Sequence, residues 1–274
     1  MSLLEVDELR VSFPGKGWRK KPVEVLHGVS LSVAPGETLG LVGESGSGKT
    51  TIGRAVLGLV TPSGGDIRFD GTSIARISAR DRRRLSRDIQ VVFQDPYTSL
   101  NPSMTVGDIL AEPLVIQGAT AKDARSRVRT LLDQVGLPSD AIERLPREFS
   151  GGQRQRVAIA RALAPEPRLI VCDEPVSALD LSTQARVLDL FVEIQRATGV
   201  AYLFVSHDLS VVRHISHRVA VLYRGDLVET GSAEHVTSSP DHPYTQKLLL
   251  AAPVADPARQ RERRLERRRL MEAS

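Results

Sequence analysis

The residues with the clearest chemistry lie in the stretch GESGSGKT, residues 43–50. It fits the phosphate-loop pattern, in which two glycines separated by four residues precede a lysine and a serine or threonine. Glycines let the backbone curl so that successive N–H groups point at phosphate oxygens, and a following helix adds positive potential. In this pattern Lys49 bridges the β- and γ-phosphates, and the Thr50 hydroxyl is a ligand of Mg²⁺. We expect the nucleotide to be contacted by Gly43, Glu44, Ser45, Gly46, Ser47, Gly48, Lys49, Thr50 and Thr51.

Two carboxylates, Asp173 and Glu174, follow the apolar run LIVC. Taken alone, such a pair after a strand is more often a solvated turn or a helix cap. Together with a phosphate loop it favours a hydrolytic site, because the carboxyl ends of parallel strands face one cleft. Asp173 then suits the Mg²⁺ shell through water, and Glu174 is placed to orient or deprotonate the attacking water.

Two further polar residues, Gln94 and His207, are expected at the ends of apolar strands. Either residue alone would more often have a structural role. Both become informative because ligands of α/β proteins bind at the carboxyl edge of the sheet. We predict that Gln94 contacts Mg²⁺ or the attacking water, and that His207 contacts the γ-phosphate.

A second anion site is predicted at the stretch FSGGQ, residues 149–153. Ser150 and Gln153 have the spacing of a capping box, which starts a helix and leaves free N–H groups at its N-terminus. A plain capped helix is the alternative, but it would need neither Gly151 nor Gly152. Such a terminus attracts anions, and its place in a helical segment suggests that it faces the nucleotide of a neighbouring molecule. The inward stripe of this helix is Val157, Ala160 and Ala164.

The elements that must position these residues follow from hydrophobic periodicity. Strand, glycine loop and helix succeed one another over residues 37–60, as the phosphate-loop mechanism requires. Apolar strands then alternate with helical stretches after residue 168, which implies a mostly parallel sheet and an α/β fold of the P-loop NTPase type. The expected strands are 3–13, 23–33, 37–43, 64–71 as a hairpin, 88–94, 168–175, 200–208 and 218–231, and the helices of the second half are 182–198 and 208–216.

Between residues 96 and 165 the pattern is helical without strands, which predicts an inserted helical subdomain. Pro113 predicts a kink or a break in its first long helix. The buried positions expected there are Val106, Ile109, Leu110, Val128, Leu131, Leu132 and Val135. The division that we predict is a core with an N-terminal antiparallel β-subdomain at 1–95 and 166–235, the helical insertion at 96–165, a C-terminal HPYT segment at 236–255 and a basic tail at 256–274.

Composition limits the function classes. The net charge of the 274 residues is +4, and residues 259–274 alone hold seven arginines against three glutamates. The body is therefore balanced in charge, which argues against a nucleic-acid-binding face. Cys172 is the single cysteine, so neither an internal disulfide nor a cysteine metal site is expected. The acidic start and the short apolar runs predict neither a signal peptide nor a membrane span.

In order and spacing, these motifs resemble those of the ATPase subunit of an ATP-binding-cassette (ABC) transporter, over about residues 3–255. GESGSGKT resembles Walker A, FSGGQ the signature motif and LIVCDE Walker B. The resemblance implies ATP and Mg²⁺ as ligands, and a head-to-tail pair in which the signature of one domain covers the γ-phosphate held by the other. It gives Gln94 the place of the Q-loop glutamine, His207 that of the switch histidine and Asp180 that of the D-loop aspartate. Phe13 falls where the family stacks an aromatic ring on adenine, although it could equally be a core residue at a strand end. Thr51 and Phe149 are slight departures from the usual pattern.

Three stretches resemble the oligopeptide, dipeptide and nickel importer branch: FQDPYTSLNP, VCDEPVSALD and HPYTQKLLLAAP. Many of these importers have a pair of ATPases, and VCDEPVSALD is more like the second of that pair, the F-type ATPase. This implies a heterodimer with a related ATPase, two transmembrane permeases, a solute-binding protein outside the cell, and a location on the cytoplasmic face of the membrane. Import of peptides is the expected function. Nickel or another small solute of the same branch remains open, as does a soluble ABC ATPase such as one serving carbon-phosphorus lyase.

The Arg-rich end is expected to be solvated or disordered, with anionic lipid or an acidic partner as the alternative ligand. A DNA-repair ABC ATPase is disfavoured, because the insertion has neither sustained heptads nor paired cysteines. A GTPase or a protein kinase is disfavoured because their base-reading and catalytic-loop motifs are missing.

Overall fold

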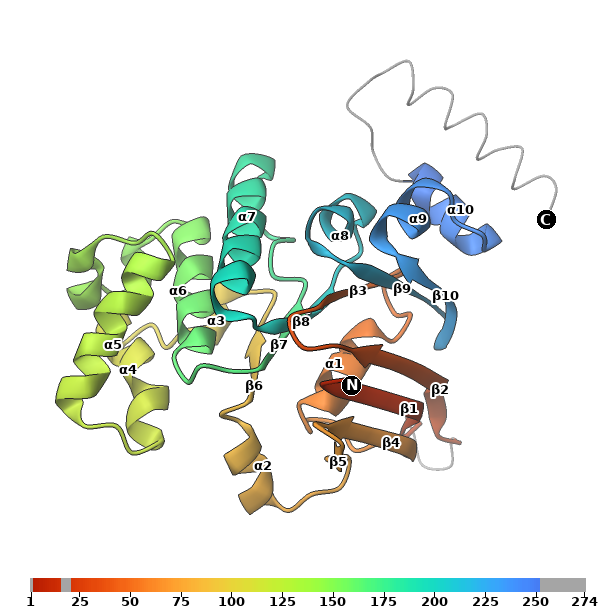
Figure 1. The fold of residues 1–274 in the computed structure, drawn as a ribbon, viewed down its shortest axis with the longest axis horizontal. Helices are drawn as coiled ribbons and strands as arrows, with labels where there is room; N and C mark the ends of the chain where they lie inside the picture. Colours follow the sequence, from red (N-terminus) through yellow and green to blue (C-terminus); the bar gives the residue numbers. More distant parts are fainter. Residues whose placement is uncertain (1, 16–20, 252–274) are drawn as a thin grey trace.

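A computed structural model describes residues 2–15 and 21–251 of the chain. The first layer is a four-stranded antiparallel sheet in the order β2-β1-β4-β5 (Figure 1). The predicted pairing of the first two strands is confirmed, with Leu4 opposite Val33 and Phe13 opposite Val23. Its strands are β1 (Leu4–Phe13), β2 (Val23–Val33), β4 (Gly64–Phe69) and β5 (Thr72–Ser73).

The second layer is a six-stranded sheet in the order β10-β9-β3-β8-β7-β6. Its pairings are parallel except that of β9 with β10, which form an antiparallel hairpin. The single strand expected over residues 218–231 is therefore wrong, because Arg224 and Gly225 turn the chain with φ of 49° and 90°. The mostly parallel sheet predicted from the sequence is therefore confirmed, and the fold is an α/β P-loop NTPase fold. Its strands are β3 (Thr38–Val42), β6 (Ile89–Val92), β7 (Leu169–Asp173), β8 (Ala201–Val205), β9 (Arg218–Tyr223) and β10 (Asp226–Ser232).

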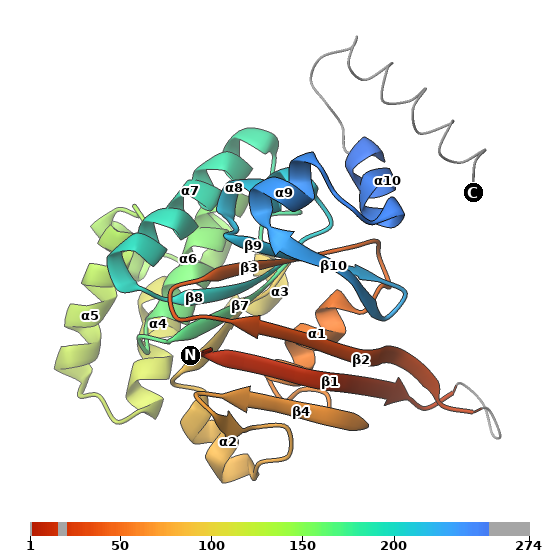
Figure 2. The same cartoon turned by 45° about the vertical axis from the view of Figure 1, so that its right-hand side comes forward.

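The six-stranded sheet is covered on both faces, which explains why its central strands are continuous apolar runs. Along β7, Leu169 and Val171 pack with helix α1 (Lys49–Val56), whereas Ile170 and Cys172 pack with helices α6 (Gly151–Leu163) and α7 (Leu181–Thr198). Alternate residues of a strand point to opposite faces. Helices α1 and α6 therefore lie on opposite faces of the sheet, as the rotated view also shows (Figure 2).

The four-stranded sheet shares its core with α1, and this core joins the two sheets. Leu4, Val11 and Leu26 of the first sheet belong to one buried cluster with Ile52 and Val56 of α1. Helix α1 is thus clamped between the antiparallel sheet and the parallel sheet. Because burial of apolar area is the main stabilising term, this shared core fixes the helix that follows the phosphate loop.

Residues 96–165 contain helices and no strand. The predicted buried positions of this segment, from Val106 to Val135, are all in the core cluster that also holds α6. The helices pack beside α7 at one end of the molecule (Figure 1). They are α3 (Pro96–Ser99), α4 (Val106–Ile116), α5 (Ala121–Gln134), the 3₁₀ helices η1 (Ser139–Glu143) and η2 (Pro146–Glu148), and α6.

The structure corrects two local expectations about helices. The helix expected over residues 49–60 ends at Val56, because Gly58 turns the chain with a left-handed φ of 73°, and Leu59 is exposed. A kink or a break was expected at Pro113, and the break does not occur, since α4 continues to Ile116. Proline removes one intrahelical hydrogen bond. This loss affects only the last turn of the helix, because α4 ends three residues later at Ile116.

Three of the four remaining helices pack at the end of the six-stranded sheet formed by β9 and β10. Val42, Val219, Val236 and Tyr244 form a third buried cluster there. None of the helices within residues 2–15 and 21–251 is both long and apolar enough to cross a membrane. The predicted basic tail at 256–274 and the end of the HPYT segment lie outside the described residues. The helices beside β9 and β10 are α8 (Leu209–Ile215), α9 (Ala233–Ser238) and α10 (Pro243–Ala251). Helix α2 (Ala79–Leu85) lies elsewhere, where Leu85 packs against the buried cluster that holds α1.

Candidate nucleotide-binding site

The phosphate loop lies between β3 and α1, as the sequence predicts. Two of its glycines are required by their surroundings. Gly43 has φ 152°, and a Cβ atom there would lie 2.1 Å from the carbonyl oxygen of Leu222. Gly48 has φ 108°, and a Cβ atom there would lie 2.6 Å from Leu26 Cδ2. The loop can therefore curl tightly against its neighbours only with glycine at these positions.

Lys49 lies inside the loop that it follows. Its side chain is 4% exposed, and Nζ donates hydrogen bonds to the carbonyl oxygens of Gly43 at 2.7 Å and Glu44 at 2.9 Å. Burial lowers the pKa of Lys49, while the nearby Glu174, Asp173 and Glu44 oppose that shift. The arrangement places an ammonium group and the N-terminus of α1 at one point, which favours an anion there.

Thr50 and Asp173 meet at the end of β7, although they are 123 positions apart in the sequence. The Thr50 hydroxyl donates a 2.9 Å hydrogen bond to Asp173 Oδ1. Burial raises the pKa of Asp173, and the bond from Thr50 acts in the opposite direction. A hydroxyl and a carboxylate are the hard oxygen ligands that Mg²⁺ prefers, so this pair fits the predicted metal site.

Glu174 is held in an uncommon backbone conformation beside His207. Its φ is 48°, in the left-handed region, and its N–H donates to the carbonyl oxygen of Val205 at 3.0 Å. Its Oε2 lies 2.9 Å from Nδ1 of His207 at the end of β8. The Glu174 side chain is 18% exposed, so it remains in contact with water. Acid and imidazole thus form one hydrogen-bonded pair.

Gln94 joins the same group through Ser177. Gln94 Nε2 donates to Ser177 Oγ at 3.2 Å, and Ser177 Oγ donates to the backbone oxygen of Glu174 at 3.1 Å. Four predicted residues from three strand ends, Gln94, Asp173, Glu174 and His207, are therefore connected by contacts or by adjacency. The linking role of Ser177 was not predicted, because the sequence analysis assigned no contact to this residue.

The second predicted anion site is built as a capped helix on the other face of the sheet. Ser150 Oγ accepts from Gln153 N at 3.3 Å, and Gln153 Oε1 accepts from Ser150 N at 3.0 Å, which confirms the capping box. The predicted inward stripe of α6 is buried as well. Within the described residues, no hydrogen bond joins Ser150 or Gln153 to the phosphate loop. A hollow lined by polar side chains, including Arg156 and Arg186, adjoins this helix end.

Asp180 and Phe13 lie apart from these contacts. Asp180 caps helix α7 by accepting from Thr183 N at 3.0 Å, and hydrogen bonds from Ser182 and Thr183 hold its pKa far below the usual value. Phe13 ends β1 and is 39% exposed, so the alternative of a core phenylalanine is wrong. Contact of its ring with adenine stays a prediction.

One residue at the loop was missed by sequence reasoning. The Tyr244 hydroxyl accepts a 2.9 Å hydrogen bond from the backbone N–H of Glu44. The motif HPYT contains Tyr244, but its spacing gives no sign of a contact 200 positions away.

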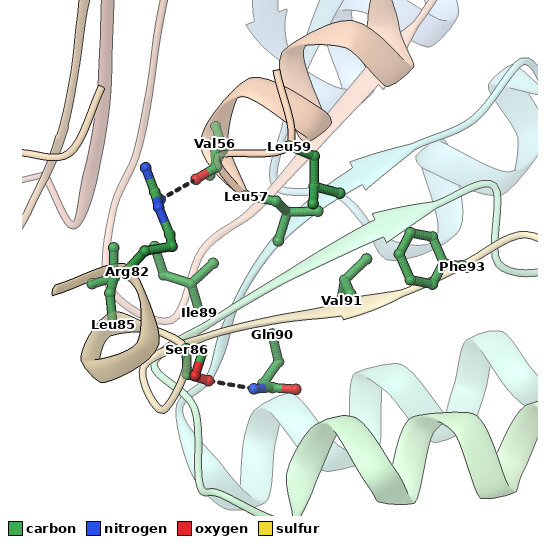
Figure 3. Close-up of a pocket in the computed structure, with 10 residues that line it drawn as sticks. All are labelled: Val56, Leu57, Leu59, Arg82, Leu85, Ser86, Ile89, Gln90, Val91 and Phe93. Atoms are coloured by element: carbon green, nitrogen blue, oxygen red, sulfur yellow. Dashed lines mark hydrogen bonds between the residues drawn. The ribbon is translucent and has the colours of Figure 1, made fainter. Parts of the chain in front are cut away.

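An apolar pocket of about 240 Å³ lies elsewhere, between the end of α1, helix α2 and strand β6. Figure 3 shows Leu57 and Leu59 on one side of this pocket, and Val91 and Phe93 on the other. None of the predicted nucleotide or metal ligands lines it. Its closest link to the site is Phe93, the neighbour of Gln94, so the pocket adjoins the site without forming part of it.

Comparison with known families decides the relationship. The family described as "ABC transporter" matches residues 26–177, and "Oligopeptide/dipeptide transporter, C-terminal region" matches residues 228–273. The chain belongs to the ABC transporter family. The term F-type ATPase, expected for a second subunit, is wrong for this chain, because the domain matched is an ABC cassette.

Curated relatives and solved structures support this membership. "Glutathione import ATP-binding protein GsiA" of Shigella boydii is 53% identical over 246 residues, which are 89% of this chain and 40% of that protein. The same protein of Escherichia coli gives the same values. The chain therefore spans less than half the length of these relatives.

Among solved structures, cbiO1 from Clostridium perfringens, part of the ABC transporter complex cbiONQ, has a TM-score of 0.78 and 28% identity, over 87% of this chain and 91% of that one. The ATP-binding cassette MJ0796, a dimer in a post-hydrolysis state bound to ADP and Pi, has a TM-score of 0.75 and 27% identity, over 84% and 98%. ABC cassettes hydrolyse ATP, and the agreement in fold extends over nearly all of the described residues.

Proposed function

We propose that this chain is the ATP-hydrolysing subunit of an ABC importer for peptides. The observation that carries the proposal is the connected group at the carboxyl edge of the sheet, in which Thr50 contacts Asp173 and Glu174 contacts His207. The C-terminal match to oligopeptide and dipeptide transporters supports the solute class. The name of the curated relatives, glutathione import, agrees with a peptide-like solute.

In the proposed mechanism, the phosphate loop holds ATP through its backbone N–H groups, and Lys49 contacts the β- and γ-phosphates. Thr50 and Asp173 would hold Mg²⁺, Asp173 through water. The ion would neutralise charge on the phosphates. Phe13 is proposed to stack on adenine. Its exposure at the end of β1 supports that role.

Hydrolysis itself is assigned to the Glu174 pair. The Glu174 carboxylate orients or deprotonates the attacking water, and His207 reads the γ-phosphate while its Nδ1 contacts Glu174. Gln94 contacts the water or Mg²⁺ and is linked to the same carboxylate residue through Ser177. The N-terminus of α6, with Ser150, is proposed to cover the γ-phosphate of a partner domain.

The partners are proposed from the family. A related ATPase domain would complete a head-to-tail heterodimer, and two membrane permeases would carry the solute delivered by an extracytoplasmic binding protein. The chain would then lie at the cytoplasmic face of the membrane. The segment from Gln94 to Asn101 is proposed to contact a permease, since Tyr97 is 63% exposed within it.

The proposal is tested by copurification and transport. The tagged chain is expected to copurify with two permeases, and vesicles that contain the complex should take up a labelled di- or tripeptide when Mg²⁺ and ATP are supplied. Vesicles with the Glu174→Gln variant are the matched control and should show uptake near background. Uptake of Ni²⁺ but not peptide would contradict the solute class, and isolation without any permease would contradict the importer.

A further inference from the structure

We infer that the Tyr244 hydroxyl positions the phosphate loop, and that helix α10 thereby becomes a part of the nucleotide site. The inference rests on the proposed function for the identity of the ligand, ATP. It begins from a contact between two distant parts of the chain: Glu44 N donates to Tyr244 Oη at 2.9 Å. Glu44 is the second residue of the loop, directly after Gly43.

The Tyr244 hydroxyl is suited to hold a backbone N–H. The residue is 8% exposed, and burial is the main cause that raises the pKa of its hydroxyl, which therefore stays protonated and neutral. A neutral hydroxyl accepts from the loop amide without bringing a negative charge toward phosphate. The bond satisfies an N–H that belongs to neither a helix nor a strand, and such groups need a partner when they leave water.

The ring of Tyr244 extends the contact to the end of β9. Its centroid is 4.2 Å from that of Tyr223. Two residues later, Gly225 N donates to the carbonyl oxygen of Ser47 at 3.0 Å. The loop is therefore held from one side at Glu44 and at Ser47, and both supports come from the C-terminal part of the chain.

The segment that carries Tyr244 is itself anchored. The Glu229 carboxylate accepts from the backbone N–H of Asp241 at 2.8 Å and of His242 at 3.2 Å, and His242 Nδ1 accepts from Tyr244 N at 3.1 Å. Tyr244 also packs in one buried cluster with Val42, the residue before the loop. A movement of α10 must therefore move the hydroxyl relative to Glu44.

This cluster also includes Leu209 and Val212 of helix α8, which begins two residues after His207. Tyr244 thus shares one buried cluster with the residue before the phosphate loop and with the helix that follows the proposed γ-phosphate contact. Its hydroxyl contacts the loop backbone and no residue assigned to hydrolysis. We therefore class Tyr244 as a positioning residue, and its loss should change nucleotide affinity more than turnover.

The consequence of losing the hydroxyl is a loop with one support fewer. The Glu44 N–H loses its hydrogen-bond partner, and the loop gains alternative conformations. ATP binding must then return the loop to its single bound conformation, which weakens the affinity. Loss of one such hydrogen bond corresponds to about a three- to tenfold higher dissociation constant for ATP. The rate at saturating ATP should stay within about twofold, because the Glu174 and His207 contacts are unchanged.

The test compares Tyr244→Phe with a matched control, Tyr202→Phe. Tyr202 also has a buried hydroxyl, which donates to the Phe191 carbonyl at 3.2 Å in the core of the sheet. Each variant loses one hydroxyl and keeps its ring. Hydrogen exchange of residues 43–47 is measured without nucleotide, and the ATP dissociation constant and turnover are measured with Mg²⁺.

We expect faster exchange at Glu44 and weaker ATP binding in Tyr244→Phe, with neither change in Tyr202→Phe. Unchanged exchange at Glu44, or equal effects of the two substitutions, would overturn the inference. The exchange measurement needs no ATP, so it decides the positioning role by itself. A wild-type chain that binds no ATP would instead overturn the proposed function.

Discussion

Glu174 combines the two least common features among the residues of the site, a left-handed backbone and a carboxylate bonded to a histidine. A non-glycine residue in this conformation costs about 1–3 kcal/mol, so the surrounding structure must hold it there. The bond from Glu174 N to Val205 and the bond from Ser177 to the Glu174 carbonyl do so. The Glu174 side chain is thereby held in an orientation in which its carboxylate contacts His207.

This geometry predicts the effect of Glu174→Gln. The amide keeps the shape of the side chain but cannot take a proton, so ATP binding is retained and hydrolysis falls by about a hundred- to ten-thousand-fold. Phosphate release at saturating ATP measures the fall. Glu166→Gln is the matched control, since Glu166 also has a left-handed φ of 57° and lies apart, in an exposed pair with Arg127. Full turnover in Glu174→Gln would refute the assigned role.

Single residues also show how far sequence reasoning reaches. Lys49, Thr50, Asp173 and Glu174 could be placed together because phosphate loops and strand ends obey general rules of α/β folds. Tyr244 could not, because its contact with Glu44 depends on how β10, α9 and α10 return across the sheet. No local pattern in the sequence records that path.

Elements were predicted well where burial sets a clear period. The strands from β7 to β9 and helix α7 follow their apolar patterns, and Phe191 of α7 packs edge-on against Tyr202 and Phe204 of β8. Helix ends were predicted less well, since a glycine turn at Gly58 outweighs the periodicity that includes Leu59. Pro113 shows the reverse case, since α4 continues past this unfavourable residue to Ile116.

The contact between helices α6 and α7 gives a prediction at the scale of elements. A Cβ atom at Gly152 would lie 2.3 Å from Thr183 Cγ2, whereas one at Gly151 would meet Leu179 at an ordinary 3.6 Å. Gly152→Ala should therefore lower stability by about 1–3 kcal/mol through overpacking. Gly151→Ala is the control and should leave stability equal or higher, because alanine favours the helix.

Thermal or urea unfolding measures both variants, and a second substitution tests the cause. Thr183→Ser removes only the methyl group that Gly152→Ala would meet, so the double variant should regain most of the lost stability. Failure of that rescue would mean that Gly152 is required for another reason than the packing of α6 on α7.

At the scale of the whole molecule, the phosphate loop and the capped N-terminus of α6 are not expected to contact the same nucleotide within one chain. The phosphate loop leads into α1 on one face of the sheet, and Ser150 begins α6 on the other. At the capped terminus of α6, Ser150 is exposed and makes no hydrogen bond to the phosphate loop of its own chain. A solved neighbour of this fold is dimeric. The proposed site shared between two molecules accounts for both placements.

A shared site predicts complementation between two inactive variants. Ser150→Arg disrupts the signature motif that a molecule contributes to the site of its partner. Glu174→Gln prevents hydrolysis of the ATP that the molecule itself binds. Each variant alone should be nearly inactive, while Ser150→Arg binds ATP with unchanged affinity in dilute monomers. In an equal mixture, about half of the pairs contain one copy of each variant. Each mixed pair has one intact site of its two, so about a quarter of the wild-type rate should return.

Phosphate release from the mixture is the measurement, and gel filtration with ATP verifies that mixed pairs form. If this chain pairs only with a different ATPase, one of the two substitutions is made in this chain and the equivalent of the other is made in the partner. Mixed pairs without recovered activity would contradict the shared site. So would wild-type protein whose rate per molecule stays constant on dilution, because a site completed by a second molecule must lose activity when the pair dissociates.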